Sequence, residues 1–121
     1  MKRRTPFLAA ACLGFAGGLI LAWMPANAQT RFDHQVRNLF FAGFSGDAES
    51  LQKGMKACED VLATNPNHAE ALVWHGGGLL MMAGDAFRKN QPNAMELWTK
   101  ALGEMQKAVE LEPKNIGVRI P

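Results

Sequence analysis

The chain has 121 residues, of which 48% are hydrophobic, and a formal net charge of +2. This length suffices for one small domain with a modest core. Three of its 13 Lys and Arg residues lie within the first four positions, so the rest of the chain carries 10 basic residues against 11 Asp and Glu. That balance removes the main support for nucleic-acid binding, because such domains carry a basic patch.

The first 28 residues predict a secretory signal peptide. Lys2-Arg3-Arg4 forms a basic head, an uncharged run extends from Phe7 to Met24, and Ala26-Asn27-Ala28 has the small–x–small pattern of a cleavage site. We therefore expect cleavage after Ala28 and export to the periplasm or out of the cell, with residues 29–121 as the mature domain. The apolar run is also long enough to leave an uncleaved membrane anchor open. Membrane contact is expected through this segment alone.

Two helices are predicted in the first half of the mature chain, at about 31–43 and 48–64, from the spacing of their apolar residues. Asp47 is the expected N-cap of the second helix. Cys58 lies on the apolar stripe of that helix, where a buried thiol behaves as a small hydrophobic residue. It is the single cysteine after Ala28, so the mature domain cannot form an internal disulfide.

Two more helices are predicted in the second half, at about 68–83 and 92–112. Asn67, with Glu70 three residues later, has the spacing of a capping box for the third helix. The polar connector Gly84–Gln91, in which Asp85–Lys89 can form a further helical turn, separates this helix from the fourth.

The helix pairs repeat along the chain. An offset of 47 residues (113 − 66) superimposes Pro66 on Pro113, and an offset of 41 (80 − 39) superimposes Leu39–Gly43 on Leu80–Gly84. The first offset pairs small residues with small ones and large apolar residues with large ones: Leu51 with Trp98, Gly54 with Ala101, Met55 with Leu102, Cys58 with Met105. Repeated helix pairs of this length predict a solenoid, in which each pair buries its apolar face against its neighbours.

The second copy resembles the tetratricopeptide repeat (TPR) family. The matching positions lie in the third and fourth predicted helices and at their ends: Leu72, Gly76, Leu79, Ala83-Gly84-Asp85, Trp98, Ala101, Met105, Ala108 and Glu112-Pro113-Lys114-Asn115. The resemblance, which is weaker in the first copy, covers most of residues 32–115. Two features depart from the family: the connector is longer, and Gly76-Gly77-Gly78 places three glycines where one is expected.

The resemblance implies an all-α solenoid of two helical hairpins behind the signal peptide. Repeat 1 would span about 31–66 and repeat 2 about 67–113, with the start of a third repeat at 114–121. Because solenoid ends need a polar cap and none follows here, we expect the open end to be covered by more of a longer chain or by a partner, including a second copy.

The resemblance also implies a binding site, because TPR proteins hold peptides or partner helices in a groove lined by the first helix of each pair. The corresponding residues of this chain, all expected to contact a partner, are Phe32, Val36, Phe40, Glu70, Val73, Trp74, Gly77 and Met81. An apolar groove containing a tryptophan and a methionine suits an apolar or helical partner. The alternative interpretation is that Trp74 and Met81 pack on a neighbouring repeat.

Catalytic and metal motifs lack their required context. Gly43–Asp47 is close to a G-x-S-x-G nucleophile elbow, but aspartate replaces its last glycine and no strand precedes Ser45. The three histidines His34, His68 and His75 do not share metal-ligand spacing, although His34 and His75 coincide at the 41-residue offset, which predicts equivalent helix positions. The C-x-x-C-H motif of haem attachment does not occur.

We therefore expect a non-catalytic scaffold or adaptor of the cell envelope that needs no cofactor. Two alternatives remain. One is the N-terminal segment of a larger exported enzyme or assembly factor whose activity lies outside this chain, and the other is a metal- or haem-handling module.

Overall fold

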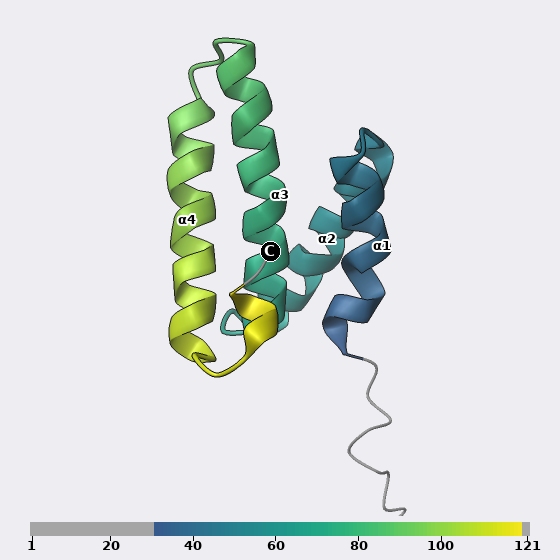
Figure 1. Ribbon diagram of the computed structural model, residues 1–121, viewed down its shortest axis with the longest axis vertical. Coiled ribbons are helices and arrows are strands. Elements are labelled where there is room, and N and C mark those ends of the chain that lie inside the picture. Colours follow the sequence, from purple (N-terminus) through teal and green to yellow (C-terminus); the bar gives the residue numbers. More distant parts are fainter. Residues whose placement is uncertain (1–30, 120–121) are drawn as a thin grey trace, which may run out of the picture.

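The computed structural model describes residues 31–119, and this part of the chain is all-α, as predicted (Figure 1). Four α-helices are followed by one short 3-10 helix: α1 (Phe32–Phe44), α2 (Ala48–Thr64), α3 (Ala69–Arg88), α4 (Ala94–Leu111) and η2 (Ile116–Val118). The expected signal peptide and its cleavage site lie outside the described residues. Among the helices that are described, none has both the length and the apolar character needed to cross a bilayer.

The start of α2 follows the prediction. The backbone enters it through a turn in which Gly46 has a φ of +113°, a conformation that glycine adopts without strain. Asp47 then caps the helix, because its carboxylate accepts a hydrogen bond from the Ser50 amide at 3.1 Å. The turn between α1 and α2 is therefore short, and the two helices pack against each other.

The predicted capping box at the start of α3 is wrong. His68 is the N-cap residue, and its Nδ1 accepts a hydrogen bond from the Ala71 amide at 3.1 Å. Glu70 cannot serve the cap because its carboxylate accepts a hydrogen bond from the Asp33 amide at 3.2 Å, at the start of α1. A long-range contact between two helices has displaced the local one.

The predicted end of α3 at Ala83 is also wrong. The helix passes through Gly84 and ends at Arg88, so the connector is shorter than the predicted one. Asp85 supports the added turn through ion pairs with Lys89 at 2.6 Å and Arg88 at 3.2 Å. The chain then turns through Asn90, at φ 51°, and α4 begins two residues later than expected.

α3 is the central element of the fold. It packs against α1, α2 and α4, whereas α4 packs on α3 and on η2. Figure 1 shows that the α3/α4 hairpin is longer than the α1/α2 hairpin and extends past it at one end. The main core, between α3 and its neighbours, includes Val36, Phe40, Cys58, Leu79 and Ala101.

Two of the three consecutive glycines let neighbouring helices approach α3. A Cβ on Gly76 would lie 3.0 Å from the Ala101 carbonyl oxygen of α4, and one on Gly78 would overlap Met55 Sδ of α2 and lie 3.0 Å from Phe40 Cε1 of α1. Residues two apart on a helix point about 200° apart, so the two glycines face opposite sides of α3. The triple glycine therefore allows α3 to fit between the hairpin partner α4 on one side and the α1/α2 hairpin on the other.

Candidate functional site

Exposed aromatic side chains gather where α1 and α3 lie side by side. Phe41 and Phe44 of α1 are 54% and 40% exposed, and the Phe41 ring centroid lies 6.0 Å from that of the half-buried Trp74 on α3. A Cβ on Gly77, one turn after Trp74, would lie 3.7 Å from Phe44 Cζ. These four residues, Phe41, Phe44, Trp74 and Gly77, are called the aromatic face below.

The position of the aromatic face follows from helix geometry. Phe40 is fully buried and contacts Trp74 with ring centroids 5.2 Å apart, so the core-facing side of α1 is fixed at this residue. Phe41 is turned by about 100° from Phe40 and leaves the core. Phe44, one turn after Phe40 and 5.8 Å from its ring, lies at the exposed end of the helix.

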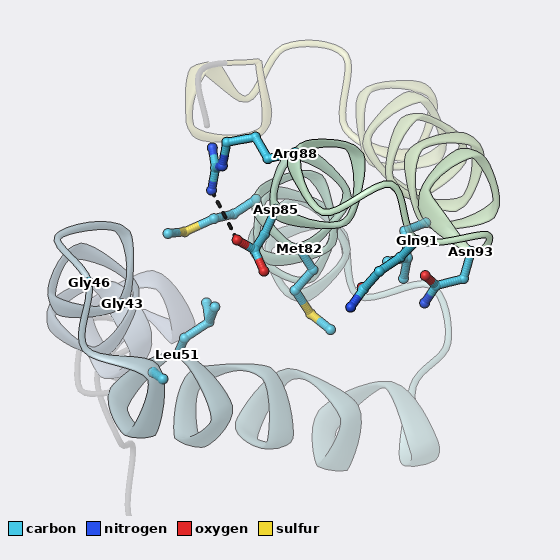
Figure 2. Close-up of a pocket in the computed structure, with 11 residues that line it drawn as sticks. Gly43, Gly46, Leu51, Met82, Asp85, Arg88, Gln91 and Asn93 are labelled. Carbon is cyan, nitrogen blue, oxygen red and sulfur yellow. Dashed lines mark hydrogen bonds and ion pairs between the residues drawn. The ribbon is translucent and has the colours of Figure 1, made fainter.

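A cleft of about 290 Å³ opens beside this face, where the longer hairpin extends past the turn between α1 and α2 (Figure 2). Its lining comes from that turn, the start of α2, the last turns of α3, the connector and the start of α4: Gly43, Gly46, Ala48, Leu51, Met81, Met82, Asp85, Arg88, Gln91, Asn93 and Leu97. Figure 2 shows Met82 and Asp85 projecting from α3 into the space bounded by α1 and α2. The extra length of the second hairpin therefore forms one wall of the cleft.

The cleft combines an apolar floor with a fixed carboxylate. The ammonium of Lys89, hydrogen-bonded to Asp85 at 2.6 Å, lowers the pKa of Asp85, and Arg88 adds a second hydrogen bond at 3.2 Å. Asp85 is therefore ionised at neutral pH. Since Leu51, Met81 and Met82 line the same space, the cleft is suited to an apolar side chain with a polar group beside it.

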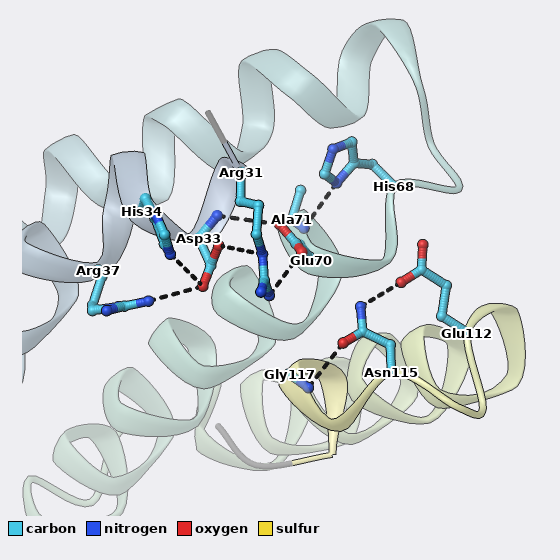
Figure 3. Close-up of polar contacts among 10 residues, drawn as sticks. All are labelled: Arg31, Asp33, His34, Arg37, His68, Glu70, Ala71, Glu112, Asn115 and Gly117. Atoms are coloured by element: carbon cyan, nitrogen blue, oxygen red, sulfur yellow. Dashed lines mark hydrogen bonds and ion pairs between the residues drawn. The ribbon is translucent and has the colours of Figure 1, made fainter. Parts of the chain in front are cut away.

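The opposite end of α1 carries a network of charged groups (Figure 3). Glu70 accepts hydrogen bonds from the Asp33 amide and, at 3.5 Å, from Arg31. Burial alone would raise the pKa of Asp33, but a hydrogen bond from Arg37 at 3.0 Å and the charge of Arg31 bring that pKa below its ordinary value. Glu70, an expected partner-binding residue, is thus held by α1.

His75 joins three helices. Its Nδ1 lies 2.6 Å from Glu104 Oε2 on α4, and its Nε2 lies 3.3 Å from Glu59 Oε1 on α2. Ionised carboxylates only accept hydrogen bonds, so both ring nitrogens must donate, which requires the imidazolium form. Burial alone would lower the pKa of His75, but the hydrogen bond and charge of Glu104, followed by those of Glu59, raise it.

The predicted equivalence of His34 and His75 is wrong. His75 is 4% exposed, whereas the His34 side chain is 52% exposed and lies 3.9 Å from Asp33. α3 lies between α4 and α2, which supply Glu104 and Glu59, whereas at the 47-residue offset the counterpart of Glu104 on α2 is Ala57, which has no carboxylate. A matching position in the sequence therefore has a different environment.

Cys58 is buried beside the His75 group. Burial, with the nearby charges of Glu104 and Glu59, raises the pKa of the Cys58 thiol to about 12. The group is therefore a neutral thiol at physiological pH. Within residues 31–119, His, Cys, Asp and Glu side chains form no cluster of three or more suited to a metal ion.

The eight predicted partner-binding residues are separated by the structure into two groups. Four of them are core residues with exposures of 8% or less: Phe32, Val36, Phe40 and Val73. Their side chains do not line an open groove, because α3 packs against the three residues of α1, and Val73 packs with Ala108 of α4 and Val118 of η2. Trp74, Gly77, Met81 and Glu70 remain partly exposed, and their contact with a partner stays a prediction.

Phe41 and Phe44 were not among the predicted site residues. They follow Arg37 at spacings of four and seven residues, next to the core stripe Phe32, Val36 and Phe40. Two phenylalanines directly beside the buried stripe were the available signal, because a single helix–helix contact buries one stripe and leaves the adjacent positions exposed.

Comparison of the chain with protein-family models, with curated proteins and with solved structures gives no match in any of the three.

Proposed function

We propose that this protein is a non-catalytic, exported interaction module that binds an apolar or helical peptide on the aromatic face. The observation that carries this proposal is the exposure of Phe41 and Phe44 beside Trp74. Large aromatic side chains are enriched at the energetic centres of protein interfaces, and exposed ones gathered from two helices form a contiguous apolar surface.

The arrangement of the helices supports the TPR-like part of the proposal. α3 packs against both helices of the preceding hairpin, and α4 packs on α3. In a helical-hairpin solenoid each unit contacts its neighbours in this way, and the first helices of successive units lie side by side. α1 and α3 would be those first helices, and the aromatic face lies between them.

The surface chemistry also favours a peptide over a small polar ligand. Gly77 leaves space beside Trp74, since a Cβ there would make only ordinary contacts at 3.7 and 4.0 Å. Met81, one turn after Gly77 on α3, lines the cleft that contains Asp85. A peptide that laid an apolar side chain on Trp74 and reached the cleft would contact both aromatic and methionine side chains, which adapt to partners of different shape.

The test is a selection of peptides from a random display library, followed by fluorescence anisotropy with each selected peptide. We expect Phe41→Ala/Phe44→Ala to weaken binding about tenfold or more, as the loss of buried aromatic anchors does. Circular dichroism should show unchanged helicity, because both side chains are exposed.

Phe87→Ala is the matched control, because Phe87 is 45% exposed but contacts Trp98 of α4. Its affinity for the same peptides should change less than twofold. A library that yields no saturable binder, or binders that respond to Phe87 and not to Phe41 and Phe44, would contradict the proposal.

A further inference from the structure

His75 links the two hairpins from the middle of α3. Its Nδ1 lies 2.6 Å from a carboxylate oxygen of Glu104 on α4, and its Nε2 lies 3.3 Å from one of Glu59 on α2. Glu104 belongs to the same hairpin as His75, whereas Glu59 belongs to the other hairpin. The contact with Glu59 is therefore a polar link between the hairpins, at the place where α2 packs against α3.

The two carboxylates are unequal partners. The Glu104 side chain is 16% exposed, so its charge would be left buried without a partner if His75 released it. The Glu59 side chain is 61% exposed and can return to water. A neutral imidazole has one N–H and can donate to one carboxylate only. We expect Glu104 to keep that hydrogen bond, which leaves an Nε2 lone pair facing the Glu59 carboxylate, and neither group can then donate to the other.

Cys58 lies beside this contact. It precedes Glu59 in α2, is 0% exposed and belongs to the same core cluster as Leu79 of α3. Met55, one turn earlier, packs against Gly78, and this contact does not involve His75. Loss of the Glu59 contact therefore acts on residues 58–64, the last turns of α2, and leaves the first half of the helix in place.

We propose that His75 is a pH-dependent switch that controls the end of α2. In its imidazolium form, His75 holds residues 58–64 against α3 through Glu59. In its neutral form it keeps Glu104 and releases Glu59. Residues 58–64 then move away from α3 more often, and the buried Cys58 thiol becomes accessible to solvent.

The titratable groups around His75 come from two helices: Glu104 from α4, and Glu59 with the Cys58 thiol from α2. Within residues 31–119, no charged group of α1 or η2 acts on its pKa. Burial alone would lower the pKa of His75, but the hydrogen bonds and charges of Glu104 and Glu59 raise it above 6.5. The contact with Glu59 is therefore fully present below pH 6.5 and is lost as the pH rises through the folded pKa.

The experiment measures how strongly the fold protects Cys58 from a maleimide reagent between pH 6 and pH 8.5. The full chain is used, and peptide mass spectrometry separates the label on Cys58 from that on Cys12. At each pH the protection factor is the labelling rate of the chain unfolded in urea divided by that of the folded chain, which removes the pH dependence of thiol ionisation. We expect this factor to fall about fivefold from pH 6 to pH 8.5, as the loss of one partly exposed ion pair allows.

Two variants of α2 test the role of Glu59. Glu59→Gln should reduce the change in the Cys58 protection factor to less than twofold, because an amide can accept from the imidazolium and donate to the neutral ring. Asp60→Asn is the matched control, since the Asp60 side chain is 64% exposed but pairs with Lys56 at 2.7 Å. This variant should keep the fivefold fall.

Hydrogen exchange shows whether the opening is local. At pH 8.5 the amides of residues 58–64 should have protection factors at least tenfold lower than those of α4. Equal protection of the two segments would overturn the proposal, because Cys58 would then be exposed by unfolding of the whole domain. So would a Cys58 protection factor that is independent of pH, or the same fall with pH in Glu59→Gln as in the unchanged protein.

Discussion

The two hairpins differ most in what covers their second helices. α2 and α4 have matching apolar stripes, yet Met55 is 8% exposed and its counterpart Leu102 is 46% exposed. The difference arises from α3, which lies against α2 and has no counterpart over α4 within residues 31–119. A stripe in the sequence thus defines the apolar side of a helix, and only the neighbouring helix decides whether that side is buried.

The hairpins also differ at their tips. A short turn with Gly46 at positive φ joins α1 to α2, whereas α3 runs one turn further before the connector to α4. The added length places Asp85 and Arg88 beside Leu51 and forms the cleft. A small difference in length between two copies of a repeat has therefore produced a potential binding surface that the first copy lacks.

The largest expected effect comes from filling the glycine that allows α2 and α3 to meet. Gly78→Leu should lower the free energy of unfolding by about 3 kcal/mol, because overpacking a filled core costs this much. Urea unfolding followed by circular dichroism measures the change. Gly77→Ala is the control, since its Cβ would make ordinary contacts, and it should not destabilise. A loss below about 1 kcal/mol for Gly78→Leu would show that α2 and α3 are not in close contact.

The second prediction compares the equivalent positions directly. Met55→Ala should cost about 2 kcal/mol, as truncation of a buried methionine does, whereas Leu102→Ala should cost less than about 1 kcal/mol because its side chain is half exposed. Both values come from the same unfolding measurement. Equal losses at the two positions would mean that α4 is covered in solution, and would remove the contrast between the hairpins.

The third prediction concerns the bridge from α2 and α4 to α3. Because the pKa of His75 is raised above 6.5 in the folded state, its stabilising contribution is complete below pH 6.5 and is lost as the pH rises through the folded pKa. Glu104→Gln should lower the free energy of unfolding by about 1.5 kcal/mol at pH 6. It should also reduce the fall in the free energy of unfolding as the pH rises.

Unfolding measured from pH 5.5 to 8.5 tests the bridge. Glu59→Gln is the graded control, because the Glu59 side chain is 61% exposed and lies 3.3 Å from His75, and its effect should be smaller. A Glu104→Gln profile parallel to that of the unchanged protein would contradict the ion pair.

The smallest expected effect is a gain in stability at the end of α3. Gly84 lies inside the helix with open space around its Cβ position, so Gly84→Ala should stabilise the fold by about 0.5–1 kcal/mol. A loss of stability would instead place the end of α3 at Ala83, where the sequence predicts it.

Local rules account for the features that were predicted correctly. The bounds of α2 and the cap at Asp47 agree with the structure because turn and cap chemistry act within a few residues. Features set by distant partners were missed. Glu70 was expected to cap α3, but its carboxylate accepts a hydrogen bond from the Asp33 amide of α1 instead. Phe40 was predicted to bind a partner, but it is buried because α3 packs on that side of α1.

Gly76, Gly77 and Gly78 also affect how the domain folds. Three glycines in sequence weaken an isolated helix by about 2–3 kcal/mol relative to alanine, so α3 has little intrinsic tendency to form. Its helical state depends on contacts with α4 on one side and with α1 and α2 on the other. If the contacts with α4, or those with α1 and α2, were lost, α3 would unfold. The two hairpins therefore unfold cooperatively.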